Sequence, residues 1–429
     1  MEILSYLQVY NLDLDSKKPK LLILSTLWIE PESSAAGYRL LQILSLYKDA
    51  GYDLHYATTA KASEFAYTDG LICHSIQVND SSFDQFIKDL NPSAVLYDRF
   101  MVEEQFGWRV RKQCPQIPQI LDTEDLHFLR KARHEAVKAD GNLKKVDEYL
   151  YSELAQRELS AIMRCDLSIM ISRIEIDLLV AKFSIDRQQL VYLPFIHKQD
   201  LDAEAGFPGF TQRKNFMAIG NLIHAPNWDS VLELKRLWPQ IRKETKAELH
   251  IYGAYPSQKV WQLHKPEEGF VIKGRAESVV AIMQEHRVLL APLRFGAGQK
   301  GKLFDAMKNG LPSVTSPIGA ESMQSESISW PGAISSSDQE FIEQAIELYR
   351  DQNIWESCQA HANTLLQEKF SGSQTEEFRK SILEFSQEEL LNKHRKKFFL
   401  TQVFNSDQQA RYKYLSKYIA LKNESKTPF

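Results

Sequence analysis

Residues 289–307 read LLAPLRFGAGQKGKLFDAM, an apolar run followed by a glycine-rich turn and then apolar residues at helical spacing. This order predicts a buried strand, a turn and a helix, which is how parallel α/β sheets present backbone N–H groups to a phosphate. The helix start carries Lys300 and Lys302, although the helix dipole already places positive charge at that end. We therefore expect an anion to bind there. The simpler alternative is a solvated pair of lysines after an ordinary turn.

Length and composition indicate a folded protein of more than one domain. A chain of 429 residues exceeds what one hydrophobic core usually organises, and 43% apolar and 25% charged residues are ordinary values for globular proteins. The 52 basic and 56 acidic residues give a net charge of −4, so no global field attracts nucleic acid, and none is expected as a partner. The four cysteines form no C-x-x-C pair and have no histidine at metal-ligand spacing, so no metal site is predicted.

Apolar runs alternate with helical patterns along both halves of the chain. The strand candidates are 21–26, 53–57, 94–97, 119–121, 167–171 and 191–195, then 216–219, 248–252, 270–272, 288–291 and 313–315. Such alternation predicts parallel sheets covered by helices on both faces. Residues 200–214, with Gly206, Pro208 and Gly209, indicate a linker between the two series. Ligands of such sheets bind beyond the carboxyl ends of the strands, so we expect the site in the cleft between the domains.

A cluster of polar side chains follows one of the first-half strands. Residues 120–130 read ILDTEDLHFLR, which places three carboxylates (Asp122, Glu124 and Asp125), His127 and Arg130 at the carboxyl edge of the first sheet. Taken alone, a single histidine in such a place is more often structural than functional.

Three blocks of the second half resemble the nucleotide-sugar domain of glycosyltransferase family 4, whose members are retaining transferases of the GT-B fold. They are AIGNLIHAPN (218–227), HIYG (250–253) and the glycine-rich segment, which continues to GLPSVT (310–315) and GAE (319–321). The first half adds DLSIMIS (166–172) and YLP (192–194). Pro226-Asn227, together with the Gly-Ala-Gly-x-Lys-x-Lys pattern, is similar to the polysaccharide-type subset of the family.

The chain departs from the commoner family pattern at two places. The family usually has a Glu eight residues before a second Glu, and these positions hold Ala297 and Asp305 here. Ala297 lacks a hydrogen bond that the family often makes to the donor sugar, whereas Asp305 keeps a carboxylate where the family binds ribose hydroxyls. An Arg usually follows the glycine that corresponds to Gly220, but this chain has Asn221. The resemblance therefore implies that Lys300 or Lys302 supplies the positive charge for the diphosphate.

The resemblance also implies the members of the site. The donor site would contain Gly37, Gly220, Asn221, Gly253, Gly296, Gly298, Gln299, Lys300, Lys302 and Asp305. The catalytic candidates are His127, Asp125, Asp122 and Lys300, because many family members place a His after the corresponding first-domain strand. No cofactor is expected beyond the nucleotide diphosphate-sugar itself as co-substrate.

We therefore predict a GT-B protein with two tandem doubly wound Rossmann-like domains. The predicted parts are an acceptor domain (1–199), a linker (200–214), a donor domain (215–385) and a helical, basic and amphipathic extension (386–429). The implied function is that of a metal-independent, retaining glycosyltransferase of hexosyl type. It would move a sugar from a nucleotide diphosphate-sugar to a glycan, lipid-linked or protein acceptor in glycan or polysaccharide biosynthesis. Two alternatives stay open: a sugar-nucleotide epimerase of the same fold, and a non-catalytic nucleotide-sugar- or glycan-binding subunit.

The sequence also bears on where the protein acts. No stretch approaches the roughly 18 apolar residues that span a bilayer, and residues 1–20 lack the pattern of a secretory signal, so we expect a cytoplasmic protein. The extension contains a basic run from Lys393 to Lys397, followed by Phe398-Phe399-Leu400. Such a stretch can lie on an anionic membrane, which would place the protein at its inner face. A solvated helix packed on its own protein is the commoner explanation of a charge run.

Overall fold

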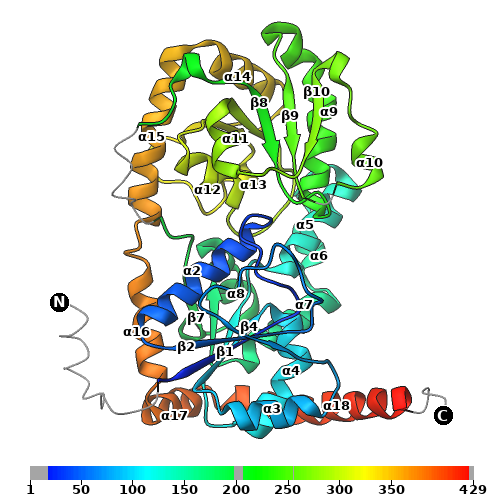
Figure 1. Ribbon diagram of the computed structural model, residues 1–429, viewed down its shortest axis with the longest axis vertical. Coiled ribbons are helices and arrows are strands. Elements are labelled where there is room, and N and C mark those ends of the chain that lie inside the picture. Colours follow the sequence, from blue (N-terminus) through cyan, green and yellow to red (C-terminus); the bar gives the residue numbers. More distant parts are fainter. Residues whose placement is uncertain (1–17, 198–205, 255, 425–429) are drawn as a thin grey trace.

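The computed structural model describes residues 18–197, 206–254 and 256–424, which form two parallel sheets with helices on both faces (Figure 1). The first sheet has the strand order β3-β2-β1-β4-β5-β6-β7, and the second has the order β10-β9-β8-β11-β12-β13. The predicted fold class is therefore confirmed. Residues 1–17, and residues 200–205 of the predicted linker, lie outside the described part.

The N-terminal domain is built around the first sheet. Its strands are β1 (Lys20–Ser25), β2 (Asp53–Thr58), β3 (Ile72–Ser75), β4 (Ala94–Asp98), β5 (Gln119–Asp122), β6 (Leu167–Met170) and β7 (Leu190–Tyr192). Its helices are α2 (Ala35–Asp49), α3 (Ser82–Leu90), α4 (Phe100–Gln113), α5 (His127–Asp140), α6 (Val146–Leu150), α7 (Glu153–Arg164) and α8 (Arg173–Phe183).

The C-terminal domain is built around the second sheet. Its strands are β8 (Lys214–Ile219), β9 (Leu249–Tyr252), β10 (Phe270–Gly274), β11 (His286–Ala291), β12 (Ser313–Thr315) and β13 (Gly332–Ile334). Its helices are α9 (Ala225–Thr245), α10 (Gln258–Trp261), α11 (Val279–Glu285), α12 (Gly301–Lys308), α13 (Pro317–Ala320), α14 (Asp338–Arg350) and α15 (Gln352–Phe370). The chain ends with α16 (Thr375–Phe385), α17 (Glu388–Lys397) and α18 (Phe399–Glu424).

The central strand β1 shows why an unbroken apolar run folds here as a strand. It pairs with β2 on one side and with β4 on the other, so both of its faces are covered. Leu22 and Leu24 point into one hydrophobic core, and Leu21 and Ile23 point into the opposite one. All four are fully buried, as expected for a strand covered by helices on both faces.

The helix α16 returns to the N-terminal domain after the chain has left the second sheet. Phe378, Ile382 and Phe385 join the hydrophobic core beneath α2, and the ring of Phe378 meets that of Tyr47 edge-on at 5.7 Å. In Figure 1, α15 and α16 run down one side of the molecule and connect its two ends.

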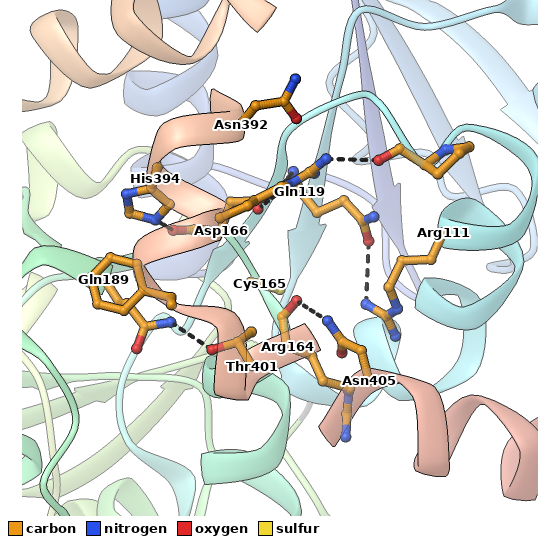
Figure 2. A pocket seen from close by; sticks show the side chains of 13 residues that line it. Arg111, Gln119, Arg164, Cys165, Asp166, Gln189, Asn392, His394, Thr401 and Asn405 are labelled. Carbon is orange, nitrogen blue, oxygen red and sulfur yellow. Dashed lines mark hydrogen bonds and ion pairs between the residues drawn. The ribbon is translucent and has the colours of Figure 1, made fainter. Parts of the chain in front are cut away.

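The C-terminal helices α17 and α18 lie at the end of the molecule opposite the C-terminal domain (Figure 1). Together with residues at the start of β5 and before β6 and β7, they line an open cavity of about 360 Å³ (Figure 2). Arg395 forms a bidentate ion pair with Asp166 at 2.7 Å, and His394 Nε2 donates to Asp166 O at 2.8 Å. Polar contacts therefore hold this end together. Of the helices within the described ranges, none has the length and apolarity needed to cross a membrane.

Candidate functional site

The glycine-rich segment after β11 lies against the N-terminal domain. Gly298 has φ +61°, and its N–H donates to Glu175 Oε1 at the start of α8, at 2.7 Å. A Cβ at Gly298 would lie 2.9 Å from the Cβ of Asp125. Ala297 packs in the hydrophobic core of the N-terminal domain. The position where the family carries its first Glu therefore contributes to the contact between the domains.

Polar bonds on either side of this segment also join the two domains. Arg133 of α5 donates to both carboxylate oxygens of Glu321, at 2.6 and 2.7 Å, and to Gly296 O at 2.8 Å. The side chain of Gln299 accepts from the N–H of Phe195 at 3.2 Å and donates to Ser322 O at 3.1 Å. Gly296 and Gln299, both predicted for the donor site, thus help to orient the domains.

The two predicted lysines lie at the start of α12 and are half-buried. Lys300 Nζ donates to the carbonyl oxygens of Ala297, at 3.1 Å, and Gly298, at 2.6 Å. Lys302 Nζ donates to Asn227 Oδ1 at 2.7 Å. Burial lowers the pKa of Lys300 to about 8, and burial together with the charge of Lys300 lowers the pKa of Lys302 to about 7. Among the described residues, neither ammonium has a carboxylate within ion-pair distance.

The loop between β8 and α9 is packed tightly beside Lys302. Asn227 Nδ2 donates to Asn221 O at 2.9 Å, and a Cβ at Gly220 would lie 2.7 Å from the Asn227 side chain. A Cβ at Gly253 would lie 2.2 Å from Gly220 O, so the close approach of the loops after β8 and β9 requires glycine there. The structure thus brings Gly220, Asn221, Gly253 and Lys302 together.

His224 precedes α9 and belongs to the same group of residues, although the sequence did not single it out. The residue is exposed, but partial desolvation of its ring by the surrounding residues lowers its pKa to about 4, and the positive charges of Arg130 and Lys302 act in the same direction. Asp125 opposes them. The imidazole is therefore neutral near pH 7, at a point where residues of both domains converge.

The first-domain carboxylates that the sequence singled out are both held by arginines. Asp122 is fully buried at the end of β5, where it accepts from Arg39 Nη2 at 3.2 Å. Burial raises the pKa of Asp122 while Arg39 opposes the shift. Asp125 forms an ion pair with Arg130. Burial alone would raise its pKa, but Arg130 and His127 hold the pKa of Asp125 well below its usual range.

His127 begins α5 and lies close to a fully buried carboxylate. Its backbone N–H donates to Glu158 Oε1 at 3.1 Å, and its Nδ1 is 3.3 Å from the same oxygen. The ring packs edge-on against Phe100 at 5.4 Å. These contacts fix the imidazole at the carboxyl edge of the sheet, where the resemblance places a histidine near the reacting centre.

Glu124 lies between the two predicted aspartates at the carboxyl edge of the first sheet, and both its backbone conformation and the surroundings of its carboxyl group are unusual. It adopts φ +63°, and Arg99 beside it adopts φ +74°, with the Arg99 N–H donating to Asp122 O at 2.9 Å. Left-handed backbone at two non-glycine residues is strained and often marks functional sites. Burial, and then the charge of Asp122, raise the pKa of Glu124 to about 8. Its Oε1 is buried without a hydrogen-bond partner.

The remaining predicted residues lie around α12 and α2. Asp305 is 3.5 Å from Lys308 Nζ, and burial raises its pKa. Lys308 in turn contacts the hydroxyl of Tyr38 on α2 at 3.3 Å. A Cβ at Gly37 would lie 2.6 Å from Glu30 O, so this glycine is needed for packing against its own preceding loop.

The sequence missed the residues that connect the domains, namely Arg133, Glu175 and Glu321. Arg133 and Glu321 are 188 positions apart in the sequence, and no local pattern predicts a contact between residues so far apart. Glu175 lies at the start of a helix, where an acidic residue is common for capping reasons alone. The only available signal was that it follows the block DLSIMIS, which resembles a family block.

Comparisons with known proteins show a family similarity in the second half of the chain. Residues 213–351 match the family model described as glycosyl transferases group 1. No protein in the curated set matches the chain.

Several solved structures share the fold at low sequence identity. Sucrose-phosphate synthase from Thermosynechococcus elongatus aligns with a TM-score of 0.61 at 12% identity, over 85% of this chain and 99% of that one. Anabaena Alr3699/HepE, in complex with UDP and glucose, aligns with a TM-score of 0.60 at 12% identity, also over 85% and 99%. A TarM mutant from S. aureus, in complex with fondaparinux, α-GlcNAc-glycerol and UDP, aligns with a TM-score of 0.53 at 12% identity. That alignment covers 72% of this chain and 58% of the TarM chain, so this chain spans a little over half of it.

These structures establish the fold, and the family model identifies the domain that carries the glycine-rich segment. The protein therefore has the GT-B fold, and residues 213–351 of its C-terminal domain match the group 1 glycosyl transferases, in agreement with the resemblance to glycosyltransferase family 4.

Proposed function

We propose that this protein is a retaining, metal-independent glycosyltransferase of hexosyl type. It uses a nucleotide diphosphate-sugar as donor and a glycan, a lipid-linked sugar or a protein as acceptor, in glycan or polysaccharide biosynthesis. The family of its C-terminal domain supports sugar transfer. Two of the solved structures with this fold are complexes with UDP, which supports a nucleotide diphosphate-sugar as the donor class.

The observation that carries the proposal is the pair of half-buried lysines at the start of α12. Two ammonium groups partly withdrawn from water, with their pKa lowered to about 8 and about 7, are unfavourably placed unless an anion joins them. A diphosphate would restore both pKa values toward the ordinary one. Lys300 and Lys302 would then stabilise the negative charge that develops on the leaving diphosphate, which is usually a large contribution to catalysis.

The N-terminal domain supplies the groups for the acceptor side. His127, held by Glu158, and Glu124, with a buried oxygen that has no partner, lie at the carboxyl edge of the first sheet. We assign them to contacts with the transferred sugar or the acceptor hydroxyl. Asp122 and Asp125 would orient this edge through Arg39 and Arg130. In a same-face substitution the donor phosphate itself takes the proton of the acceptor hydroxyl, so no side chain is required as the base.

The experiment is turnover with a panel of nucleotide diphosphate-sugars, measured as release of the nucleoside diphosphate, for the wild type and for Lys302→Gln. We expect one donor to be hydrolysed slowly without acceptor, with kcat/KM about 100-fold lower in the variant. Lys243→Gln, on the exposed end of α9, is the matched control and should leave the rate unchanged. Interconversion of two sugar nucleotides would support the epimerase instead. Folded protein that binds no member of the panel would refute the transferase.

A further inference from the structure

The helix α18 shows its polar side to its own protein. Gln189 Nε2 donates to Thr401 Oγ1 at 3.3 Å, Asn405 Nδ2 donates to Arg164 O at 3.4 Å, and Arg109 Nη2 donates to Ser416 Oγ at 3.3 Å. Two of these three contacts are visible in Figure 2. None of the α18 residues that the structure describes belongs to a hydrophobic core.

The opposite side of the same helix carries apolar and aromatic residues. Phe399, Tyr414, Tyr418 and Leu421 are between 61 and 66% exposed. At about 100° per residue these four positions fall on one side of the helix, whereas Thr401, Asn405 and Ser416 fall on the other. We call the four residues the outer stripe. An ordinary surface helix buries its apolar side and exposes its polar side, whereas most of the described side chains of α18 show the opposite arrangement, with the half-buried Ile419 as an exception.

The charges around the outer stripe indicate what covers it. Residues 386–429 contain nine lysines and arginines but only four acidic residues, although the whole chain has a net charge of −4. Lys393 and Lys396 of α17 and Lys417 of α18 are exposed, and Lys413 lies over the ring of Tyr414 at 5.8 Å. A second copy of this helix would bring like charges together, whereas an anionic surface would attract them. Aromatic and aliphatic side chains flanked by lysines are typical of helices that lie in a membrane interface.

We propose that the outer stripe of α18 docks on an anionic lipid surface, with the α18 axis in the plane of the interface and the lysines of α17 and α18 against the headgroups. The strands of the first sheet run from this end of the molecule to the domain interface. Because β1 has six residues, about 20 Å separates this end of the molecule from the domain interface. Docking of α18 on a lipid surface would account for the predicted membrane contact of the extension. It would also favour a lipid-linked acceptor, and this part of the proposal rests on the proposed function.

The test is flotation of the full chain with vesicles of phosphatidylcholine alone and of phosphatidylcholine with about one-third phosphatidylglycerol. We expect binding to the anionic vesicles only. The double variant Tyr418→Ser/Leu421→Ser should weaken it at least about tenfold. The matched control Val280→Ser/Ile354→Ser removes exposed apolar side chains from the C-terminal domain and should bind as the wild type does. Lys413→Gln/Lys417→Gln should weaken binding about fivefold per lysine and reduce its salt dependence.

Three outcomes would overturn the proposal: no binding of folded wild type to anionic vesicles, equal binding to neutral vesicles, or undiminished binding of the double variant. A dimer in solution that the double variant dissociates would assign the stripe to a second copy instead. A second assay distinguishes failure of the membrane proposal from failure of the proposed transferase activity: release of the nucleoside diphosphate without vesicles. The wild type and the double variant should turn over the donor at the same rate. No turnover by either protein would count against the transferase activity and leave the membrane proposal to the flotation result.

Discussion

At the scale of single residues, the candidate site depends on contacts between distant parts of the chain. The place of Lys300 and Lys302 at the start of α12 could be predicted, because a glycine-rich turn and a helix start are local patterns. Asp122 and Asp125 were predicted from the same kind of local pattern. In the structure, Asp122 pairs with Arg39, which is distant in the sequence, and Asp125 pairs with Arg130 in the helix that follows. Glu124 stands out only through its backbone strain and its buried, unpartnered oxygen, and neither property can be read from residue type.

Glu124→Gln should stabilise the protein at neutral and higher pH. The pKa of Glu124 is raised to about 8 from an ordinary value near 4.3, so the folded protein keeps a proton that the unfolded chain has already released. This group's contribution to stability is therefore greatest below about pH 4.5 and falls as the pH rises to about 8. Glutamine does not ionise, so we expect a gain on the order of 1–3 kcal/mol at pH 8 that vanishes toward pH 5.

The measurement is urea unfolding of wild type and Glu124→Gln at pH 5, 7 and 8.5, with the exposed Glu326→Gln as control. Parallel pH profiles for wild type and Glu124→Gln would show that Glu124 is already ionised in the folded protein.

At the scale of elements, most strands were predicted, including the three-residue strand β12 at 313–315, but two edge strands were not. The candidates 21–26 and 53–57 correspond to β1 and β2, because strands covered on both faces need nearly continuous apolar residues. The edge strands β3 and β13 were missed. The sequence of β3, ICHS, is largely exposed, and β13 contains only Gly332, Ala333 and Ile334. Their pairing depends on a neighbouring strand rather than on their own pattern.

The contact between the glycine-rich segment and α8 gives a prediction at this scale. Gly298→Ala would place a Cβ 2.9 Å from the Cβ of Asp125, in addition to the strain of its φ of +61°. Gly141→Ala is a matched control, because Gly141 has φ +70° but nothing within 4 Å of the added carbon. We expect about 1 kcal/mol of destabilisation for Gly141→Ala and clearly more for Gly298→Ala, together with weaker nucleoside diphosphate binding. Chemical unfolding and calorimetric titration measure the two effects. Equal losses at both positions would mean that the close packing of Gly298 against Asp125 is not needed.

At the scale of the whole molecule, the two-sheet architecture followed from the alternation of strands and helices, but the path of the last helices did not. The side chains of α16 reach a core that includes residues more than 300 positions earlier, such as Tyr47. The apolar spacing of α16 shows that it packs on something. It cannot show on which domain, because both domains present apolar surfaces.

Truncations should separate the structural helices from the surface helix. Ending the chain after Phe370 removes Phe378, Ile382, Phe385 and Leu391 from the N-terminal core, which should cost several kcal/mol and lower the Tm by about 10 °C or more. Ending it after Phe398 removes α18, whose described residues join no hydrophobic core, and should lower the Tm by only a few degrees. Thermal unfolding followed by circular dichroism measures both. A similar loss of Tm for the two truncations would assign α18 a structural role.

The most direct test of the account is calorimetric titration of the protein with nucleoside diphosphates between pH 6 and pH 9. An anion favours the charged lysines, so affinity should fall as the pH rises through the values near 7 and 8 to which Lys302 and Lys300 are lowered. Lys302→Gln should bind more weakly at pH 6 and show a flatter pH profile, whereas Lys243→Gln should match the wild type. Binding that is unaffected by both pH and Lys302→Gln would contradict the assignment of the diphosphate to the start of α12.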